Sequence, residues 1–363
     1  MGREAVGTGT AGAPRVLSGI TPTGRLHLGN YLGALVHWTR LQHMYESFFS
    51  VADLHAITTR QDPRTLRATI REMTAVLIAV GIDPQRAVLF VQSDVPAHAE
   101  LAWILLCLAP MGRLERMTQF KEKAGAERES ASAGLFSYPV LQAADILLYG
   151  GWPPRPVLVP VGADQRQHLE LARDLAARFN HRFGTVFAAP EALIAEAGAR
   201  VMGLQNPERK MSKSARTPAD TLYLLDSPAE IRRKLARAVT GPGRAVQFDP
   251  SQPGLYNLLT IYQLLSGVSP TAIEEHFRGR GYAELKGELA DLVIATLQPI
   301  QERYRRVSQD PGYLDSVLAA GAERARAAAH VVLVAAKEAV GLGAGTAGDG
   351  RMGDERAGEG VGP

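Results

Sequence analysis

The sequence predicts an α/β fold: a domain built on a parallel sheet, followed by a mostly α-helical second domain. Strand-like apolar runs alternate with helix-like stretches over the first part of the chain, which is typical of a parallel sheet with helical crossovers. After the segment KMSKS at Lys210–Ser214 the stretches are helix-like, with no convincing strand. The chain has 363 residues, of which 46% are hydrophobic, enough to bury one large core or two modest ones.

The elements of the first domain are expected in a regular order. A short strand at Val16–Leu17 precedes a helix over Asn30–Tyr45, where apolar residues recur at helical spacing. The next expected elements are a strand at Ser47–Asp53, an amphipathic helix over Leu66–Val80 that Gly81 stops, a strand at Val88–Val91, a buried helix over Tyr138–Tyr149, a strand at Val157–Val161 and a helix over Gln165–Phe179.

Helices also dominate the second domain, at Ile231–Val239, Leu255–Leu265, Tyr282–Tyr304 and Tyr313–Val340. These elements divide the chain into a disordered tail at 1–13, a sheet domain at 14–190, a segment at 191–220 that carries Lys210–Ser214, a helical domain at 221–340 and a disordered tail at 341–363. Both tails hold too few apolar residues to order themselves. A return of the chain to the first domain around 310–340 is the alternative.

Composition narrows the class of protein. The formal net charge of +3 is compatible with an RNA partner met through local basic patches. Cys107 is the only cysteine, so disulfides within the chain are excluded, and its apolar surroundings predict a buried thiol. No apolar run has signal-peptide or membrane-spanning length, so we expect a soluble, cytoplasmic protein without a membrane partner. Candidates for RNA phosphate contacts, which a solvated helix face explains equally well, are Arg232, Arg233, Lys234 and Arg237.

The loop Thr21–Asn30 (TPTGRLHLGN) follows directly after the first strand. In a doubly wound sheet, ligands bind beyond the carboxyl ends of the strands, and Gly24 and Gly29 let a phosphate approach the backbone there. The helix that opens near Asn30 favours an anion at its N-terminus. His27 can donate a hydrogen bond to phosphate oxygens as charge builds up in a transition state. The alternative is an ordinary tight loop with His27 on the surface.

The segment Lys210–Ser214 suits the diphosphate of a nucleotide, because its two lysines supply point charges on flexible stems and its two serines supply hydroxyl donors. Attack of a carboxylate on the α-phosphate of ATP needs positioning and stabilisation of the departing pyrophosphate. A second basic loop, with Lys121 and Lys123, is a candidate to close over the same phosphates, against a solvated charge run as the alternative. The pairing of Lys210–Ser214 with Thr21–Asn30 is more specific than either motif alone.

A carboxylate lies inside the apolar helix expected over Tyr138–Tyr149. Asp145 therefore needs a compensating hydrogen-bond donor. An indole N–H donates and cannot accept, so a buried carboxylate is a chemically apt reader of tryptophan. Gln142 shares the same helix face, three residues earlier. The alternative is a structural aspartate satisfied by a backbone amide or an arginine.

Four further strings carry a family resemblance: "YPVLQAADILLY", "VPVGADQRQHLELARDLAARFN", "ERMTQFKEK" and "ARVMGLQNPERKMSKS". With the two nucleotide motifs they closely resemble tryptophanyl-tRNA synthetases, from about residue 16 to about residue 343. The resemblance implies a class I aminoacyl-tRNA synthetase with a Rossmann catalytic domain at 14–190 and a helical domain at 221–340 that reads the anticodon. It further implies a homodimer that makes tryptophanyl-adenylate from L-tryptophan and ATP with Mg²⁺, and then charges tRNA(Trp). No structural metal and no DNA partner are expected.

The resemblance also assigns roles to residues, with Asp145 matching the family's indole-binding aspartate. The candidate catalytic residues are His27, Lys123, Lys210 and Lys213. The candidate ATP-binding residues are Thr21, Pro22, Thr23, Gly29, Asn30, Gly162, Ala163, Asp164, Val201, Lys210, Met211, Ser212, Lys213 and Ser214. The candidate tryptophan-binding residues are Asp145, Gln142, Tyr138, His55, Gln165, Val159 and Val161, although core packing explains the two valines equally well.

The chain departs from the commoner family pattern at several places. Thr21 stands where glutamine is frequent, Gln142 where methionine is common, and Ala163 where glutamate is usual, which removes a carboxylate from the nucleotide contact. The link Gly150–Pro156 is longer than is typical. We hypothesise that Thr21 and Gln142 alter the tolerance of the amino-acid pocket for tryptophan analogues.

Three other functions compete with this interpretation. The first is an enzyme of the same class that charges tyrosine. The second is a catalytically silent paralogue that binds tRNA or a regulatory partner, against which the retained lysines of Lys210–Ser214 argue. The third is a nucleotidyltransferase of the same fold, which has no need of a long helical extension after the lysine segment.

Overall fold

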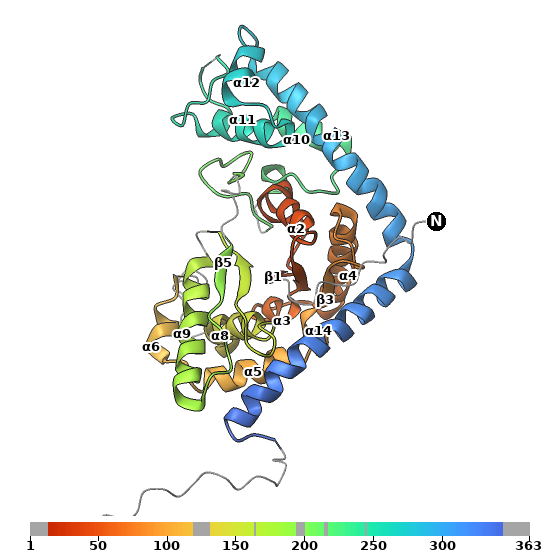
Figure 1. Cartoon of the computed structure of the whole chain (residues 1–363). Coiled ribbons are helices and arrows are strands. Elements are labelled where there is room, and N and C mark those ends of the chain that lie inside the picture. Colours follow the sequence, from red (N-terminus) through yellow and green to blue (C-terminus); the bar gives the residue numbers. More distant parts are fainter. Residues whose placement is uncertain are drawn as a thin grey trace, which may run out of the picture.

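The computed structural model describes residues 14–118, 131–162, 165–193, 200–213, 217–243 and 245–343. Its centre is a five-stranded parallel sheet with the strand order β3-β2-β1-β4-β5 (Figure 1). The strands are β1 (Arg15–Ile20), β2 (Glu46–Val51), β3 (Val88–Val91), β4 (Val157–Pro160) and β5 (Glu191–Leu193). The chain runs outward from β1 through β2 and β3 and then resumes on the other side with β4 and β5. The switch point of this doubly wound sheet therefore lies between β1 and β4, and the predicted α/β fold is confirmed.

The edge strand β5 was not predicted. Its three residues are exposed or half-buried and form no apolar run, so hydrophobic periodicity carries no sign of it. The strand expected to reach Asp53 ends at Val51, because Asp53 begins the short helix α3 (Asp53–Ala56).

Helices cover both faces of the sheet. Around the strands lie α2 (Val36–Leu41), α4 (Pro63–Val80), α5 (Ala97–Leu106), α6 (Met111–Glu115), α8 (Ala133–Leu147) and α9 (Arg166–Phe183). Toward the C-terminus follow α10 (Pro228–Ala236), α11 (Pro253–Ser266), α12 (Pro270–His276), α13 (Tyr282–Ser308) and α14 (Pro311–Ala339). The short helix α12 was not expected; Ser269 caps it and Pro270 occupies its first turn.

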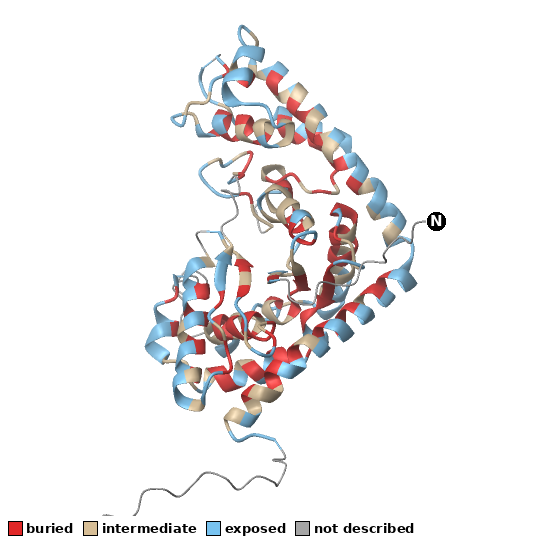
Figure 2. Ribbon diagram, viewed as in Figure 1, coloured by how far each residue is buried: buried red, intermediate tan, exposed pale blue. Residues whose placement is uncertain are grey.

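Side chains on the inner strands alternate between two hydrophobic cores, as the period of a β-strand requires. Phe49 and Leu89 belong to the core that includes residues of α2 and α4. Leu17, Phe48 and Phe90 belong to the core that includes residues of α5, α8, α9 and α14. Figure 2 shows buried residues on the strands and on the inner sides of these helices, with exposed residues outside.

The helix expected over Asn30–Tyr45 is interrupted. It consists of α1 (Leu28–Asn30), a π-helical turn η1 (Tyr31–Leu35) and α2. The wider π-helical turn changes which side chains face inward, and Leu28, Leu35 and Trp38 are all buried in one core.

The last helix, α14, returns to the sheet. Figure 1 shows it running diagonally from the end of α13 past β3 toward α5. Gly321 lies so close to β3 that a Cβ atom there would be 1.8 Å from the carbonyl oxygen of Leu89. Ala325 and Ala329 are fully buried in the core that α14 shares with α5 and α8. Residues 311–339 thus pack against the sheet, which agrees with the alternative that the chain returns to the first domain around 310–340.

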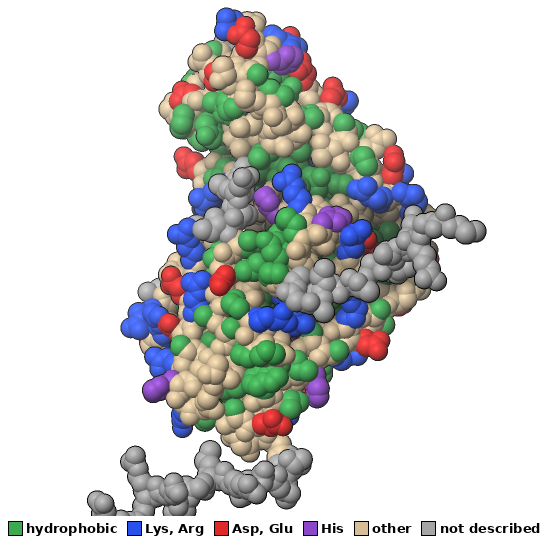
Figure 3. Space-filling model, viewed as in Figure 1, with side chains coloured by type: hydrophobic (Ala, Val, Ile, Leu, Met, Phe, Trp, Pro, Cys, Tyr) green, Lys and Arg blue, Asp and Glu red, His purple; other side chains and the backbone are tan. Residues whose placement is uncertain are grey.

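The surface differs from expectation at Cys107, which is exposed and not a buried thiol. It follows α5, four residues after Trp103, whose side chain is 67% exposed. Acidic and basic side chains are interspersed over the face drawn in Figure 3. Among the described residues, no helix combines the length and the apolar character needed to cross a membrane.

Candidate active site

Segments that follow four of the parallel strands meet at the carboxyl edge of the sheet. Thr21 follows β1, His55 follows β2, Gln92 follows β3 and Gly162 follows β4. In a doubly wound sheet this edge, at the switch point, is where ligands bind. The predicted nucleotide and amino-acid residues therefore come from one side of the molecule.

The loop after β1 ends in a reciprocal hydrogen-bonded cap on α1. The backbone N–H of Asn30 donates to Nδ1 of His27 at 3.2 Å, and the backbone N–H of His27 donates to Oδ1 of Asn30 at 3.2 Å. Earlier in the loop, the N–H of Thr23 donates to the carbonyl oxygen of Thr21 at 2.8 Å, and Pro22 is buried. The loop is thus held in one shape by its own polar groups.

His27 is a buried, neutral imidazole. Burial, and after it the positive charges of Lys213 and Lys210, lower its pKa to about 4. Because Nδ1 accepts the Asn30 N–H, the single ring proton belongs on Nε2, which leaves that nitrogen as a donor. The alternative of a surface histidine is wrong for this residue, since His27 is 3% exposed.

The lysine segment lies directly against this loop. Nζ of Lys213 donates to the carbonyl oxygen of Thr21 at 2.8 Å, and Gly24, at φ +82°, lies close enough that a Cβ atom would be 3.4 Å from Cβ of Lys213. Burial lowers the pKa of Lys213 to about 8. Lys210 is exposed, yet near enough to act on the pKa of His27. The structure therefore brings together the loop Thr21–Asn30 and the lysine segment, which lie far apart in the sequence.

Val201 and Met211 form the buried floor of the lysine segment. The N–H of Met211 donates to the carbonyl oxygen of Val201 at 3.0 Å, and both side chains are buried. A Cβ atom at Gly29 would lie 3.6 Å from Cβ of Met211, so the floor of one motif touches the helix opening of the other.

The segment Thr221–Asp226, which we name the bridging segment, joins both motifs to the helical part of the chain. The N–H of Leu28 donates to the carbonyl of Leu222 at 2.8 Å, and the N–H of Leu224 donates to the carbonyl of Leu26 at 3.0 Å. The hydroxyl of Thr221 donates to the carbonyl of Ser212 at 3.2 Å. One short stretch of backbone thus contacts the loop after β1 and the lysine segment together.

Lys234 of α10 holds the bridging segment from below. Its Nζ donates to Oδ2 of Asp226 at 2.6 Å and to the carbonyl oxygen of Thr221 at 2.8 Å, and the side chains of Lys234 and Asp226 are 7% and 2% exposed. The expectation that Lys234 lies on a solvated, RNA-facing helix surface is therefore wrong. Arg232, Arg233 and Arg237 are exposed and remain candidates, and Arg232 pairs with Asp291 at 2.6 Å.

Asp145 receives three side-chain donors. Nε2 of His55 lies 2.8 Å from Oδ2, while Nε2 of Gln92 and Nδ1 of His98 lie 2.7 Å and 2.6 Å from Oδ1. Nε2 of His98 in turn hydrogen-bonds with the hydroxyl of Tyr149 at 3.0 Å. Among the described residues, neither a backbone amide nor an arginine donates to this aspartate, so the structural alternative does not hold in that form.

The Asp145 carboxylate stays ionised and keeps room for a ligand. Burial would raise its pKa, but the hydrogen bonds and charges of His55 and His98 outweigh burial and hold the pKa below its ordinary value. A carboxylate offers about four acceptor positions. Three are in use, and the free one is on Oδ2, beside His55. With 13% of the Asp145 side chain exposed, a ligand donor can reach it.

The other predicted amino-acid residues lie around Asp145 and along α8. Nε2 of Gln142 donates to Oε1 of Gln165 at 3.2 Å, and the hydroxyl of Tyr138 hydrogen-bonds with Nε2 of His168 at 3.0 Å. The rings of His55 and Tyr138 meet edge to face with centroids 6.1 Å apart. Val159 is buried in the core beneath, and Val161 packs against that core, which agrees with the packing interpretation of the valines.

Sequence reasoning missed Gln92, His98 and Tyr149 as partners of the aspartate. No spacing in the sequence links these three polar residues to Asp145. The apolar setting of His98 was the one available signal, because a buried imidazole requires a partner.

Some predicted positions lie outside the described residues. They are Lys121, Lys123, Ala163, Asp164 and Ser214, together with the tails 1–13 and 344–363. Gly162 is described, and its carbonyl oxygen accepts from the N–H of Gln165 at 3.0 Å.

Comparisons with known proteins agree with this geometry. The family model for tRNA synthetases class I (W and Y) matches residues 10–298. A tryptophan–tRNA ligase of Gloeobacter violaceus is 52% identical over 328 residues, which cover 90% of this chain and 96% of the relative. The structure of a tryptophanyl-tRNA synthetase from Mycoplasma pneumoniae superposes with a TM-score of 0.82 at 35% identity, covering 91% of this chain and 98% of the other. That of a tryptophanyl-tRNA synthetase from Campylobacter jejuni, complexed with ADP and tryptophan, has a TM-score of 0.77 at 36% identity and covers 90% and 100%.

Proposed function

Because the chain belongs to the class I tRNA synthetases for tryptophan and tyrosine, and among them to the tryptophanyl-tRNA synthetases, we propose that the carboxyl edge of its sheet activates L-tryptophan with ATP. The product, tryptophanyl-adenylate, then esterifies tRNA(Trp). The observation that carries the nucleotide part is the contact between Lys213 and the Thr21 carbonyl. This contact places an ammonium group beside the turn where a phosphate approaches the backbone.

In the activation step, a carboxylate oxygen of tryptophan attacks the α-phosphorus of ATP, and the bond to the departing pyrophosphate breaks. The reaction needs alignment and charge stabilisation more than proton transfer. Nε2 of neutral His27 donates to the phosphate oxygens, and Lys210 and Lys213 stabilise the pyrophosphate. ATP enters as its Mg²⁺ complex, so this metal belongs to the substrate. We keep Lys123, Asp164 and Ser214 as further candidates on the basis of the family resemblance.

Tryptophan lies with its indole N–H on the free acceptor position of Asp145. The ring of Tyr138 lines the same pocket beside His55. Gln165, hydrogen-bonded to Gln142, is the candidate for the amino-acid ammonium group. A neutral aspartic acid would offer the indole N–H a weaker acceptor, and the donors from His55 and His98 prevent that by keeping the carboxylate charged.

The tyrosine alternative is disfavoured by the relatives near 50% identity, which are tryptophan–tRNA ligases. A silent paralogue is disfavoured by the intact cradle of His27, Asn30 and Lys213. Burial lowers the pKa of Lys213, and perturbed pKa values of this kind cluster at functional sites, which a catalytically silent chain does not need.

We further propose that the helical part formed by α10–α13 reads the tRNA anticodon, and that the protein acts in the cytoplasm as a homodimer. The exposed apolar side chains of Trp103 and Met111, 67% and 63% exposed, support a subunit interface at α5 and α6. Aromatic and methionine side chains are enriched in the centres of such interfaces.

Tryptophan-dependent exchange of labelled pyrophosphate into ATP tests the proposal. The chain should catalyse the exchange with tryptophan and not with tyrosine. Asp145→Ala should lose it at ordinary tryptophan concentrations, because the indole N–H loses its acceptor and three donors lose their anion. Absence of exchange by the unmodified chain, or equal exchange with tyrosine, would overturn the assignment.

A further inference from the structure

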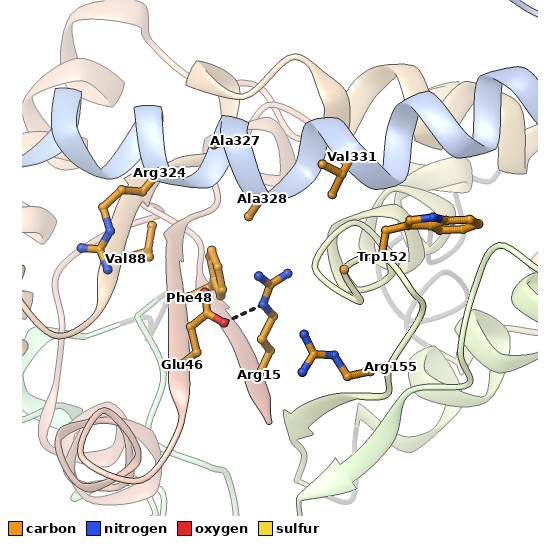
Figure 4. A pocket seen from close by; sticks show the side chains of 11 residues that line it. Arg15, Glu46, Phe48, Val88, Trp152, Arg155, Arg324, Ala327, Ala328 and Val331 are labelled. Carbon is orange, nitrogen blue, oxygen red and sulfur yellow. Dashed lines mark hydrogen bonds and ion pairs between the residues drawn. The ribbon is translucent and has the colours of Figure 1, made fainter. Parts of the chain in front are cut away.

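A second cavity lies at the opposite, amino edge of the sheet. It has a volume of about 450 Å³ and opens between the first residues of β1 and β2, the link Gly150–Pro156 and α14 (Figure 4). Arg15 and Glu46, which pair with each other at the start of these strands, form its base. Small-molecule sites in proteins have volumes of this order. The cavity is separate from the candidate active site, which occupies the carboxyl edge.

The link Gly150–Pro156, longer than is typical of the family it resembles, builds one wall of this cavity. Arg15 seats the link: its Nη1 donates to the carbonyl oxygen of Tyr149 at 3.2 Å. Gly151, at φ +72°, lies so close that a Cβ atom would be 3.2 Å from Nη1 of Arg15. The backbone N–H of Arg155 closes the link by donating to the carbonyl of Gly150 at 3.0 Å. Gly151, Trp152 and Arg155 of this link thus line the cavity.

Positive charge exceeds negative charge in the cavity. Arg15, Arg155 and Arg324 line it together with one carboxylate, that of Glu46. Nε of Arg15 donates to Glu46 at 2.8 Å, and Nη1 of Arg324 donates to the carbonyl of Pro84 at 3.0 Å. Within the described part of the chain, the guanidinium group of Arg155 has no hydrogen-bond acceptor or ion-pair partner. Figure 4 shows the guanidinium groups of Arg15 and Arg155 directed toward the same space. Glu46 offsets the charge of Arg15, and an anion between the two guanidinium groups would offset the charge of Arg155 that remains.

The rim of the cavity is apolar. The indole of Trp152 is 54% exposed and Val331 of α14 is 45% exposed, and both border the opening. Large apolar side chains left in water beside a cationic cavity suit a ligand that carries a ring or an alkyl body next to its charge.

We propose that this cavity binds a small organic anion, in which a phosphate or carboxylate lies between Arg15 and Arg155 and an aromatic or apolar body packs on Trp152 and Val331. Guanidinium groups donate in pairs to either kind of anion, so the shared chemistry is a bidentate oxyanion attached to an apolar group. The inference is independent of the proposed synthetase activity, since none of these side chains belongs to the candidate active site.

Isothermal titration calorimetry of the full chain tests the proposal, with 1-naphthyl phosphate and 1-naphthoate as probes and saturating tryptophan present to occupy the amino-acid pocket. At least one probe should bind with a stoichiometry of one. Arg155→Ala should weaken this binding by about tenfold or more, as loss of a charge-assisted pair predicts. Trp152→Ala should weaken it severalfold. Both side chains are exposed, so these variants should fold normally.

The matched control is Arg178→Ala, which removes an exposed arginine on α9, away from the cavity, and should leave the affinity unchanged. The phosphate and carboxylate arms identify the anion. Inorganic phosphate should bind more weakly than the naphthyl compound, and equal affinities would refute the role of the apolar rim. Binding of neither probe, or undiminished binding by Arg155→Ala, would refute the site.

Discussion

Among single residues, Lys213 shows how the burial that positions a charged group also changes the pKa of that group. Its ammonium donates to the Thr21 carbonyl, and its Cβ lies close to Gly24. Burial disfavours the charged form of a lysine, and it lowers the pKa to about 8. His27 responds in the same direction for the same reason, with its pKa lowered to about 4 by burial and then by the two lysines. At neutral pH the phosphate cradle therefore offers one ammonium from Lys213 and one neutral imidazole.

This pKa predicts an alkaline limit to activation. As the pH rises through about 8, the free protein loses the Lys213 proton and with it the charge that we propose stabilises pyrophosphate. The value of kcat/KM for ATP in pyrophosphate exchange should therefore fall above about pH 8, approaching tenfold per pH unit. Lys213→Arg keeps its charge to much higher pH and should move this alkaline limb upward. An alkaline limb at the same pH in Lys213→Arg would assign the titration to another group.

Gln142 is the residue for which a change of selectivity is predicted. Its amide donates to Gln165, and it shares a face of α8 with Asp145. Gln142→Met removes this hydrogen bond and replaces a polar wall by a flexible apolar one. Inhibition constants for indole-based tryptophan analogues should shift severalfold, while KM for ATP stays unchanged. Identical constants for the two forms would contradict a role in selectivity.

Among the elements, the bridging segment Thr221–Asp226 links the two nucleotide motifs to α10. It hydrogen-bonds to the loop after β1 and to Ser212. Nε2 of Gln301, on α13, donates to the carbonyl oxygens of Leu224 and Asp226 at 2.9 Å each. The lysine segment is thus connected to the helical part through the bridging segment, by hydrogen bonds that the side chains of Thr221 and Gln301 donate to backbone carbonyls.

The buried pair beneath this segment predicts an asymmetric response to mutation. Lys234→Met leaves Asp226 buried without its cation, which costs about 3–5 kcal/mol in the free energy of unfolding. The double variant Lys234→Met with Asp226→Asn leaves no uncompensated charge and should recover part of this loss. Urea unfolding followed by circular dichroism measures both. A single variant within about 1 kcal/mol of the unmodified chain would show that the pair is dispensable.

The contact between α14 and β3 predicts opposite effects for two helical glycines. Gly321→Ala places a Cβ atom 1.8 Å from the Leu89 carbonyl oxygen, so α14 must move away from the sheet at a cost of about 1–3 kcal/mol. Gly287→Ala, in α13, meets nothing within 4 Å and should stabilise the fold by about 0.5–1 kcal/mol. Thermal unfolding of both variants provides the comparison. A Gly321→Ala variant that is as stable as the unmodified chain, or more stable, would show that α14 does not depend on this close approach.

In the whole molecule, an exposed aromatic face predicts association. Trp103 is 67% exposed on α5, and Cys107 follows one helical turn later. Trp103→Glu places a charge in the proposed subunit interface and should convert the dimer to a monomer in sedimentation equilibrium. Val268→Glu, 40% exposed in the helical part, is the control that should leave the dimer intact. A monomeric unmodified chain, or a dimer that survives Trp103→Glu, would place any interface elsewhere.

Local patterns in the chain were sufficient for the elements whose causes are local. The strands β1 to β4 and the helices α4 and α9 follow from apolar periodicity, with Gly81 ending α4 as expected. The loop Thr21–Asn30 and the segment Lys210–Ser214 were recognisable because each holds, within a few residues, the glycines or lysines that phosphate binding requires. These two motifs, with the four longer strings that resemble tryptophanyl-tRNA synthetases, were enough to predict the family.

Other features depend on partners that are distant along the chain, and no local pattern reports them. Asp145 obtains its donors from residues 90, 53 and 47 positions away, and the burial of Lys234 depends on the bridging segment that crosses it. The exposure of Cys107, the strand β5 and the return of α14 to β3 likewise follow from how the layers pack. A polar group in an apolar run indicates that a hydrogen-bond partner is needed. Only the tertiary structure determines which side chain comes within hydrogen-bonding distance.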